Sequence, residues 1–197
     1  MGALLAAVCV NVFAAHPAAG TLKQVERGEW LRLARLSCSE DYEVSSRAGE
    51  QLRKLIIRLP NQQRLELIND PDQEIRIQAI QVSAKYFRTH VDEWCRTVEN
   101  SRTNLDKYKL MDTFEACRLN DRDLISYLTV CHGFRNTDDR GLRIAVIESM
   151  GRAKVKTKAQ RDLVVSVLGI FATNGGHKDD RARAFSASHN LNETNPF

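Results

Sequence analysis

Proline, glycine and aromatic residues are all scarce in this chain. Its 197 residues include four prolines, ten glycines and 7% aromatics. So little proline and glycine excludes a collagen-like chain and a proline-rich disordered one. An apolar content of 43% is enough for one domain with a hydrophobic core. The composition, rich in helix-forming residues, therefore predicts a folded chain built mainly of helices.

A strong excess of one charge is also missing. The chain has 29 basic and 25 acidic residues, which leaves a formal net charge of +4. A dedicated nucleic-acid binder usually concentrates positive charge far more than this. The sequence therefore predicts a mildly basic surface on which both charges are mixed.

The chain also lacks recognisable catalytic motifs. It contains no H-E-x-x-H, no phosphate-binding loop and no G-x-S-x-G. The acidic pairs at residues 40–41, 138–139 and 179–180 all begin expected helices, where the helix dipole favours anions. Cys131 and His132 are adjacent, so on a helix their side chains point about 100° apart and cannot work as nucleophile and base. We therefore predict no catalytic residue, no metal site and no cofactor.

Residues 1–20 read differently from the rest of the chain. The stretch MGALLAAVCVNVFAAHPAAG has no ionisable side chain except Cys9 and His16, and its apolar run spans residues 3–15. An apolar run followed by small residues is typical of a secretory signal peptide, although the usual basic residues before the run are missing. The run is also short for a membrane span. We expect a signal peptide at 1–20. The alternatives are a start codon further upstream or a buried first helix.

Removal of residues 1–20 would leave Cys38, Cys95, Cys117 and Cys131. An even number of cysteines in an exported chain is compatible with disulfides. Their spacing matches no metal-binding signature. Burial of each as a small apolar side chain on a helix is the alternative to pairing.

From residue 26 onward the sequence predicts a succession of amphipathic helices with short breaks. The expected helices are 27–38, 40–58, 61–69, 71–87, 90–101, 104–118, 121–134, 139–154, 158–172 and a weak 179–189. Most breaks contain a residue type that caps helix N-termini. These capping candidates are Ser39, Asp70, Thr89, Asp121 and Thr157.

The stretch NDPDQEIRIQA, from residue 69, illustrates the design. Asp70 is expected to cap the helix, and Pro71 at the first helical position would lose no hydrogen bond. The apolar stripe of this helix is expected to contain Ile75, Ala79, Val82 and Tyr86.

A related pattern returns at NTDDRGLRIAVIESMGRA, from residue 136. Leu142-Arg143 corresponds to Ile75-Arg76, 67 residues earlier. A weaker copy near Tyr108 lies halfway between them, and another near Val44 precedes Ile75 by 31 residues. The period is therefore about 31 to 34 residues, with two helices in each unit. Such a period is typical of a helical solenoid.

The two clear copies resemble the start of a bacterial-type HEAT repeat, in which Asp-Pro and a short acidic turn precede Val-Arg and Ala. The resemblance implies an all-α, α-α superhelix of about 4 to 5 helix pairs over residues 21–175, with a weak terminal helix and polar tail at 176–197. It also implies that Asp70, Pro71, Arg76, Asp138 and Arg143 are structural motif residues, with each arginine contacting an Asp of an adjoining turn. Tyr108 and Lys109 depart from the motif in the middle repeat.

The second helix of each pair has an apolar stripe of its own. In 121–134 this stripe is expected to contain Leu124, Ile125, Leu128 and Cys131. Second helices of stacked pairs are expected to line the concave face, so their outward side chains are the predicted binding residues. These predicted binding residues are Arg96, Arg122, Tyr127 and Arg161.

Taken together, these features predict an exported, non-enzymatic helical-repeat module that binds a protein or peptide. We expect it in the periplasm or secreted, with no membrane span once the leader is removed. The alternatives are a nucleic-acid-associated HEAT-repeat protein and a HEAT-repeat enzyme subunit of the bilin-lyase type. The basic run from Arg152 to Arg161 is the feature that favours nucleic acid. Such cations also suit a turn that follows a helix C-terminus.

Overall fold

The computed structural model describes residues 24–114, 119–174 and 177–194. These stretches contain ten α-helices, one short 3-10 helix and no strand, so the fold is all-α as the sequence predicts. The first five α-helices are α1 (Gln24–Ser37), α2 (Tyr42–Ile57), α3 (Asn61–Leu67), α4 (Gln73–Phe87) and α5 (Val91–Asn100). They are followed by α6 (Asn104–Thr113), α7 (Asp121–Gly133), η1 (Phe134–Asn136), α8 (Arg140–Gly151), α9 (Lys158–Asn174) and α10 (Lys178–Thr194).

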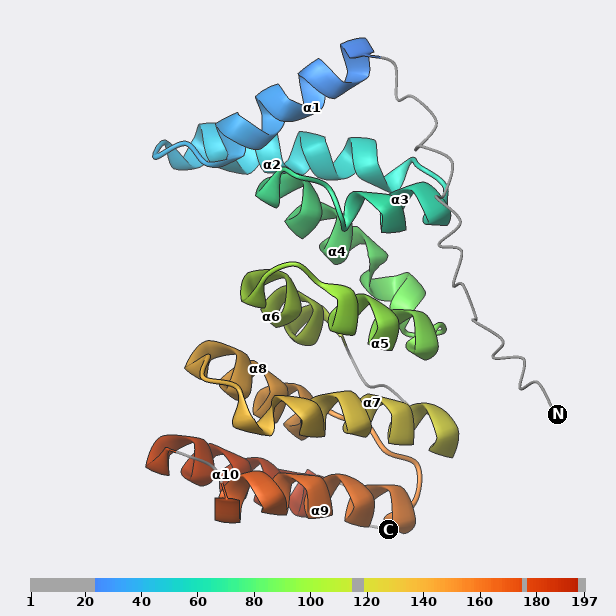
Figure 1. Ribbon diagram of the computed structural model, residues 1–197, viewed down its shortest axis with the longest axis vertical. Coiled ribbons are helices and arrows are strands. Elements are labelled where there is room, and N and C mark those ends of the chain that lie inside the picture. The colour runs from blue at the N-terminus through green and yellow to red at the C-terminus, as the bar shows by residue number, and fades with distance from the viewer. Residues whose placement is uncertain (1–23, 115–118, 175–176, 195–197) are drawn as a thin grey trace, which may run out of the picture.

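The helices stack one after another along the long axis of the molecule, from α1 at one end to α9 and α10 at the other (Figure 1). Helices α2, α4, α6, α8 and α10 each pack on the next and form one layer. A second layer contains α5, α7 and α9, which also pack in order. Because each helix buries its apolar side against its neighbours in the stack, the arrangement agrees with the expected α-α superhelix.

The clearest correction at this level concerns the helix starts. Asp72, and not Asp70, caps α4, because its carboxylate accepts hydrogen bonds from the backbone N–H groups of Glu74 at 3.0 Å and Ile75 at 3.2 Å. Pro71 therefore precedes the helix instead of opening it. Asp139 likewise caps α8, through the N–H of Leu142 at 2.9 Å.

Asp138 and Asp70, the two expected motif aspartates, have other environments. Asp138 is exposed and does not cap α8. Asp70 is buried. Its carboxylate accepts a hydrogen bond from the backbone N–H of Asp72 at 2.8 Å and forms an ion pair with Arg27 of α1. In Asp-Pro-Asp the second aspartate satisfies the free helix N–H groups, which leaves the first to bind elsewhere.

Other expected caps are displaced by one or two residues. Asp41 caps α2 in place of Ser39, and Asn120 caps α7 in place of Asp121. His90 precedes α5 without a side-chain cap, while Thr89 donates to the carbonyl of Tyr86 at 3.1 Å. The prediction at α9 is confirmed, since the Gln160 N–H donates to the Thr157 hydroxyl at 3.2 Å.

The buried face of α4 is rotated from its expected position. Ile75 and Ala79 are buried as predicted, but Val82 and Tyr86 are only partly buried. The core side of this helix is completed by Ile80, Ser83 and Phe87. The helix also has buried polar residues on this side, including Arg76 and Gln78, which an apolar pattern does not identify.

An aromatic cluster fills the middle of the stack. Trp94 on α5, Phe114 at the end of α6 and Tyr127 on α7 are all fully or almost fully buried. The Trp94 and Phe114 ring centres are 4.3 Å apart, and those of Phe114 and Tyr127 are 5.3 Å apart. Trp94 donates its indole N–H to the Leu110 carbonyl of α6 at 3.2 Å. The cluster thus joins three helices and satisfies the one buried indole donor within it.

Helix α10 is longer than the sequence predicts. It spans Lys178–Thr194 and buries Asp180, Ala184 and Leu191 against the stack. Contacts with both α8 and α9 hold it in place. Because only a few of its side chains are apolar, the periodicity that identifies a helix is weak here.

Candidate functional site

The two motif arginines connect successive helices of the first layer. Arg76 is the fourth residue of α4, and its Nε lies 3.1 Å and 3.0 Å from the two carboxylate oxygens of Asp106 on α6. Its Nη1 donates to the carbonyls of Asp70 at 3.0 Å and Pro71 at 3.1 Å. Both side chains of this pair are almost fully buried. Arg76 therefore holds α6 against the turn before α4 and is not available to a ligand.

Arg143 repeats this arrangement between α8 and α10. It is the fourth residue of α8, and its Nε donates to Asp180 of α10 at 2.8 Å. Its Nη1 donates to the Thr137 carbonyl before α8. Arg27, the fourth residue of α1, pairs with Asp70 in a similar way. The acceptors Asp106 and Asp180 are each the third residue of their helices, a regularity that the sequence pattern did not reveal.

Tyr127 is not a binding residue on the surface. Its side chain is fully buried in the aromatic cluster, and its hydroxyl lies 2.8 Å from the Ser149 hydroxyl of α8. Ile125 of α7, which was expected in the core, instead has 55% of its surface exposed. The core side of α7 is built from Leu124, Tyr127, Leu128 and Cys131.

The three predicted binding arginines have different environments. Arg96 on α5 is exposed and pairs with Glu93 on the same helix at 2.8 Å. Arg122 on α7 is also exposed, and it reaches Asp92 of α5 at 3.2 Å. Arg161 on α9 is mostly buried, with its Nε 3.7 Å from Asp162. The structure therefore leaves Arg96 and Arg122 accessible on neighbouring helices, whereas Arg161 is mostly buried.

Two grooves meet on the surface of the second layer. One, of about 370 Å³, lies between α5 and α7, and the other, of about 240 Å³, lies between α7 and α9. Ile125 and Thr129 line both, so we treat them as one surface, the α5–α7–α9 groove. Its lining residues are Asp92, Cys95, Arg96, Glu99, Ile125, Ser126, Leu128, Thr129, Val130, His132, Leu163 and Val167.

The α5–α7–α9 groove changes character along its length. At α5 its walls carry charges of both signs, from Asp92, Arg96 and Glu99. Between α7 and α9 four of the six lining residues are apolar, and among them Ile125 and Leu163 are exposed by 55% and 39%. Large apolar side chains exposed side by side are a feature of interaction surfaces. Sequence periodicity could not find this groove, because it assigned Ile125 to the core.

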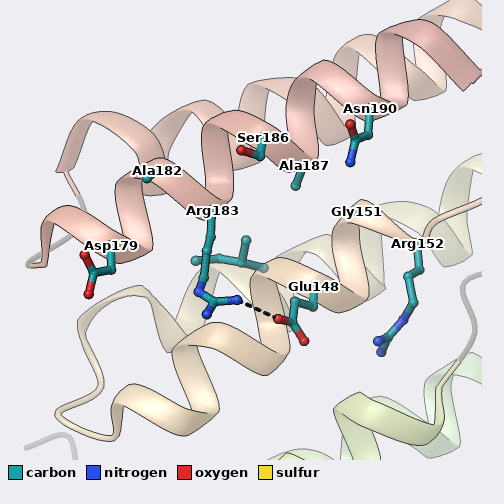
Figure 2. Close-up of a pocket in the computed structure, with 10 residues that line it drawn as sticks. Glu148, Gly151, Arg152, Asp179, Ala182, Arg183, Ser186, Ala187 and Asn190 are labelled. Carbon is teal, nitrogen blue, oxygen red and sulfur yellow. Dashed lines mark hydrogen bonds and ion pairs between the residues drawn. The ribbon is translucent and has the colours of Figure 1, made fainter.

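A larger groove, of about 650 Å³, lies between α8 and α10. Gly151 and Ala187 let these helices approach closely, since a Cβ on Gly151 would lie 3.0 Å from the Cβ of Ala187. Figure 2 shows Arg183 reaching from α10 to Glu148 on α8, where the ion pair measures 3.0 Å. Arg152 donates to the Asp112 carbonyl at 3.3 Å. Because its charged groups already bind one another or the backbone, this groove is a weaker candidate for ligand binding.

The basic run from Arg152 to Arg161 is not a continuous cationic track. Arg152 contacts Asp112, and Lys158 pairs with Asp162 at 3.1 Å. Arg161 is mostly buried beside the same Asp162. A phosphate backbone needs a series of accessible cations. The run is therefore only partly neutralised, since a carboxylate lies near three of its five cations while Lys154 and Lys156 are exposed.

The described cysteines are poorly suited to nucleophilic chemistry. Cys38, Cys95 and Cys131 are free thiols, while Cys117 lies outside the described residues. Burial raises the pKa of Cys95 to about 11 and the pKa of Cys131 to about 12. Because the thiolate is the reactive form, neither of these two thiols is activated at neutral pH. Cys131 is buried and His132 is exposed, so the adjacent pair does not form a catalytic unit.

Two further kinds of site are a cluster of metal ligands and a membrane-spanning helix. Within residues 24–114, 119–174 and 177–194, no group of three or more His, Cys, Asp or Glu residues could hold a metal ion. None of the helices in the described part of the chain is long and apolar enough to cross a membrane. The expected leader at residues 1–20 lies outside the described residues.

Comparison of the chain with protein families, curated protein sequences and solved structures found no match in any of the three.

Proposed function

We propose that the chain is a non-enzymatic helical-repeat module that binds a segment of another protein along the α5–α7–α9 groove. The observation that carries the proposal is the exposure of Ile125 and Leu163 in the lining of this groove, between helices whose other large apolar residues are buried or partly buried. An amphipathic segment laid across two helices would bury both side chains, which is a common way for helical surfaces to bind peptides.

The lining of the groove specifies the chemistry of the partner. An apolar side chain of the partner would lie over Ile125 and Leu163, between α7 and α9. Flanking residues of both charges would meet Arg96, Asp92 and Glu99, which all lie on the α5 wall of the groove. A partner with mixed charge fits this lining better than a uniformly anionic polymer, because a phosphate backbone would meet two carboxylates there.

Family and location form a second part of the proposal. The resemblance to HEAT repeats is supported by the paired arginines at the fourth positions of α4 and α8, which connect neighbouring helices. Export to the periplasm or the medium is supported by the uncharged apolar run at residues 3–15. Sequencing the N-terminus of protein purified from its native host tests export. A chain that begins after residue 14 or residue 20 would support it, and one that begins at Met1 would contradict it.

The binding proposal can be tested without knowing the partner. Peptides selected from a random display library on the immobilised full chain serve as probes, and fluorescence anisotropy measures their affinity at physiological salt. We expect Ile125→Glu to weaken the selected peptides by at least about tenfold, because removal of a central apolar anchor commonly costs 2 kcal/mol or more. Arg96→Glu should have a smaller effect, because Arg96 lies at the rim and is largely hydrated.

Phe185→Glu is the matched control. Phe185 is an exposed apolar residue on α10, and it does not line the α5–α7–α9 groove. Its substitution should leave peptide affinity unchanged. If Ile125→Glu left the affinity of the selected peptides unchanged, the binding surface would lie elsewhere. Tight binding of duplex DNA at physiological salt would overturn the protein-binding proposal in favour of a nucleic-acid function.

A further inference from the structure

A separate groove of about 550 Å³ lies between the end of α2, the first turn of α3, the second half of α4 and the residues just before α5. Its lining residues are Ile57, Asn61, Arg64, Val82, Lys85, Tyr86, Arg88, Thr89 and His90. Three of these residues are cationic, and no carboxylate is found among the described residues that form the lining. We refer to it as the basic groove. It shares no lining residue with the α5–α7–α9 groove.

The basic groove also has an apolar and aromatic wall. Ile57, at the end of α2, is 56% exposed. The rings of Tyr86 and His90 stack with their centres 3.9 Å apart and their planes 9° from parallel. His90 Nδ1 lies 3.0 Å from the Tyr86 carbonyl oxygen, which fixes the His90 ring against Tyr86. A flat, fixed ring pair beside an exposed isoleucine can accept an apolar side chain at little entropic cost.

Helix-end electrostatics explain only part of this cluster of cations. Lys85 lies in the last turn of α4 and Arg88 follows the helix, where the dipole favours positive charge. Arg64 comes from α3, yet it lines the same groove. Its Nη2 donates to the neutral side chain of Asn61, and within the described part of the chain its buried Nε donates to no acceptor. The groove thus combines positive charge from two helices with an exposed apolar surface.

From this geometry we propose that the basic groove binds an acidic segment of a partner protein. Carboxylates of the segment meet Arg64 and Lys85, and an apolar side chain between them packs on Ile57 and Tyr86. A protein segment fits better than nucleic acid because the positive charge does not continue. Asp92 and Glu93 lie two and three residues after His90, in the first turn of α5. They would repel a phosphate backbone that left the groove.

The test uses two synthetic peptides with a fluorescein label. One consists of glutamate and leucine, and the other has every glutamate replaced by glutamine. Fluorescence anisotropy with the full chain at physiological salt measures both affinities. We expect the glutamate peptide to bind and the glutamine peptide to bind at least about tenfold more weakly, because several charge-assisted contacts are lost together.

Variants then locate the binding site. Lys85→Glu should weaken the glutamate peptide by about fivefold, which is the upper end for one exposed charge contact. Ile57→Ser should weaken both peptides, because it removes the apolar contact and leaves the charges. The matched control for charge is Arg102→Glu, which reverses an exposed cation outside the groove. Arg102→Glu should leave binding of the glutamate peptide unchanged.

The proposal is overturned if neither peptide binds, if both bind equally, or if Lys85→Glu and Ile57→Ser leave the affinity unchanged. It is also overturned if single-stranded DNA displaces the glutamate peptide at physiological salt, since that would make the groove a nucleic-acid site. Ile125→Glu should not affect the glutamate peptide. Because Ile125→Glu tests the α5–α7–α9 groove and Lys85→Glu tests the basic groove, the two proposals can fail separately.

Discussion

The steps between successive helices of the first layer are held in two different ways. From α4 to α6 and from α8 to α10, a buried arginine crosses to a buried aspartate. From α6 to α8 no such pair exists in the described residues. The fourth residue of α6 is Lys107, whose Nζ lies 5.6 Å from the centre of the Phe134 ring in η1. The third residue of α8 is the apolar Leu142.

The middle step relies on the aromatic cluster, and the one ion pair that crosses it in the described residues, between Arg152 and Asp112, is exposed and 3.9 Å long. Phe114 closes α6, and the Tyr127 hydroxyl binds Ser149 of α8 from the neighbouring layer. A buried ion pair contributes little net stability, because desolvation offsets most of the attraction, but the loss of one partner is costly. Aromatic packing spreads its contribution over many contacts. Replacement of one side chain of a charged step should therefore cost much of the stability of the fold. Each replacement in the apolar step should cost only a small part of it.

The largest expected effect comes from breaking the first charged step. Arg76→Met leaves the Asp106 carboxylate buried without its cation, since both side chains are almost fully buried. We expect the free energy of unfolding to fall by about 3–5 kcal/mol, the usual cost of breaking a buried ion pair. Urea unfolding followed by circular dichroism would measure it.

The double variant Arg76→Met/Asp106→Leu is the control for this prediction. It removes both charges, so the uncompensated carboxylate disappears and most of the lost stability should return. If the double variant were as unstable as Arg76→Met, the attraction within the pair would itself account for the lost stability. The explanation of the charged step by an uncompensated buried carboxylate would then be wrong.

Sequence reasoning could identify these arginines but not their partners. Arg76 and Arg143 stand out because each follows an apolar residue in the same motif, 67 residues apart. Asp106 belongs to a degenerate repeat, and Asp180 was expected only to open a helix. Which carboxylate an arginine reaches depends on how neighbouring helices are placed in the stack. That placement is determined by packing between repeats, so the sequence of a single repeat does not predict it.

The misplacement of Tyr127 has a different cause. Residues 124, 127, 128 and 131 of α7 have ideal spacing for one buried side, yet 125 looked the better core residue because isoleucine is more apolar than tyrosine. Tyrosine is easily buried when its hydroxyl finds a partner, and Ser149 supplies one at 2.8 Å. A periodic pattern cannot show that partner. The same bias hid the exposure of Ile125, on which the proposed groove depends.

The second charged step should break with a smaller effect. Arg143 is slightly more exposed than Arg76, and its Nε contacts one oxygen of Asp180. We expect Arg143→Met to lower the free energy of unfolding by about 2 kcal/mol, near the value for one hydrogen bond to a charged group. Urea unfolding of both variants under the same conditions would rank the two steps. A loss equal to that of Arg76→Met would show that the extra oxygen contact at Asp106 adds nothing.

The smallest expected effect is a loss of stability at alkaline pH, and it arises from buried groups beside the apolar step. Burial raises the pKa of Cys131 to about 12, from an ordinary value of 9.0, and it raises the pKa of Tyr127 well above 10.0. Above pH 9 the unfolded chain therefore releases protons that the folded chain keeps, so stability is fully present below pH 9 and falls as pH rises toward 12. One such group changes the free energy of unfolding by at most about 1.4 kcal/mol for each pH unit.

Cys131→Ala separates this effect from general alkaline unfolding. The variant is less stable at neutral pH because it leaves a small cavity, but its free energy of unfolding should fall less steeply above pH 9, where the buried thiol of the unaltered chain begins to contribute. Cys38→Ser, at an exposed position, should keep the slope of the unaltered chain. Urea unfolding between pH 9 and the onset of alkaline denaturation would give the three slopes. Identical slopes for Cys131→Ala and the unaltered chain would mean that the thiol is not held protonated. The middle step would then be more open to water than its packing indicates.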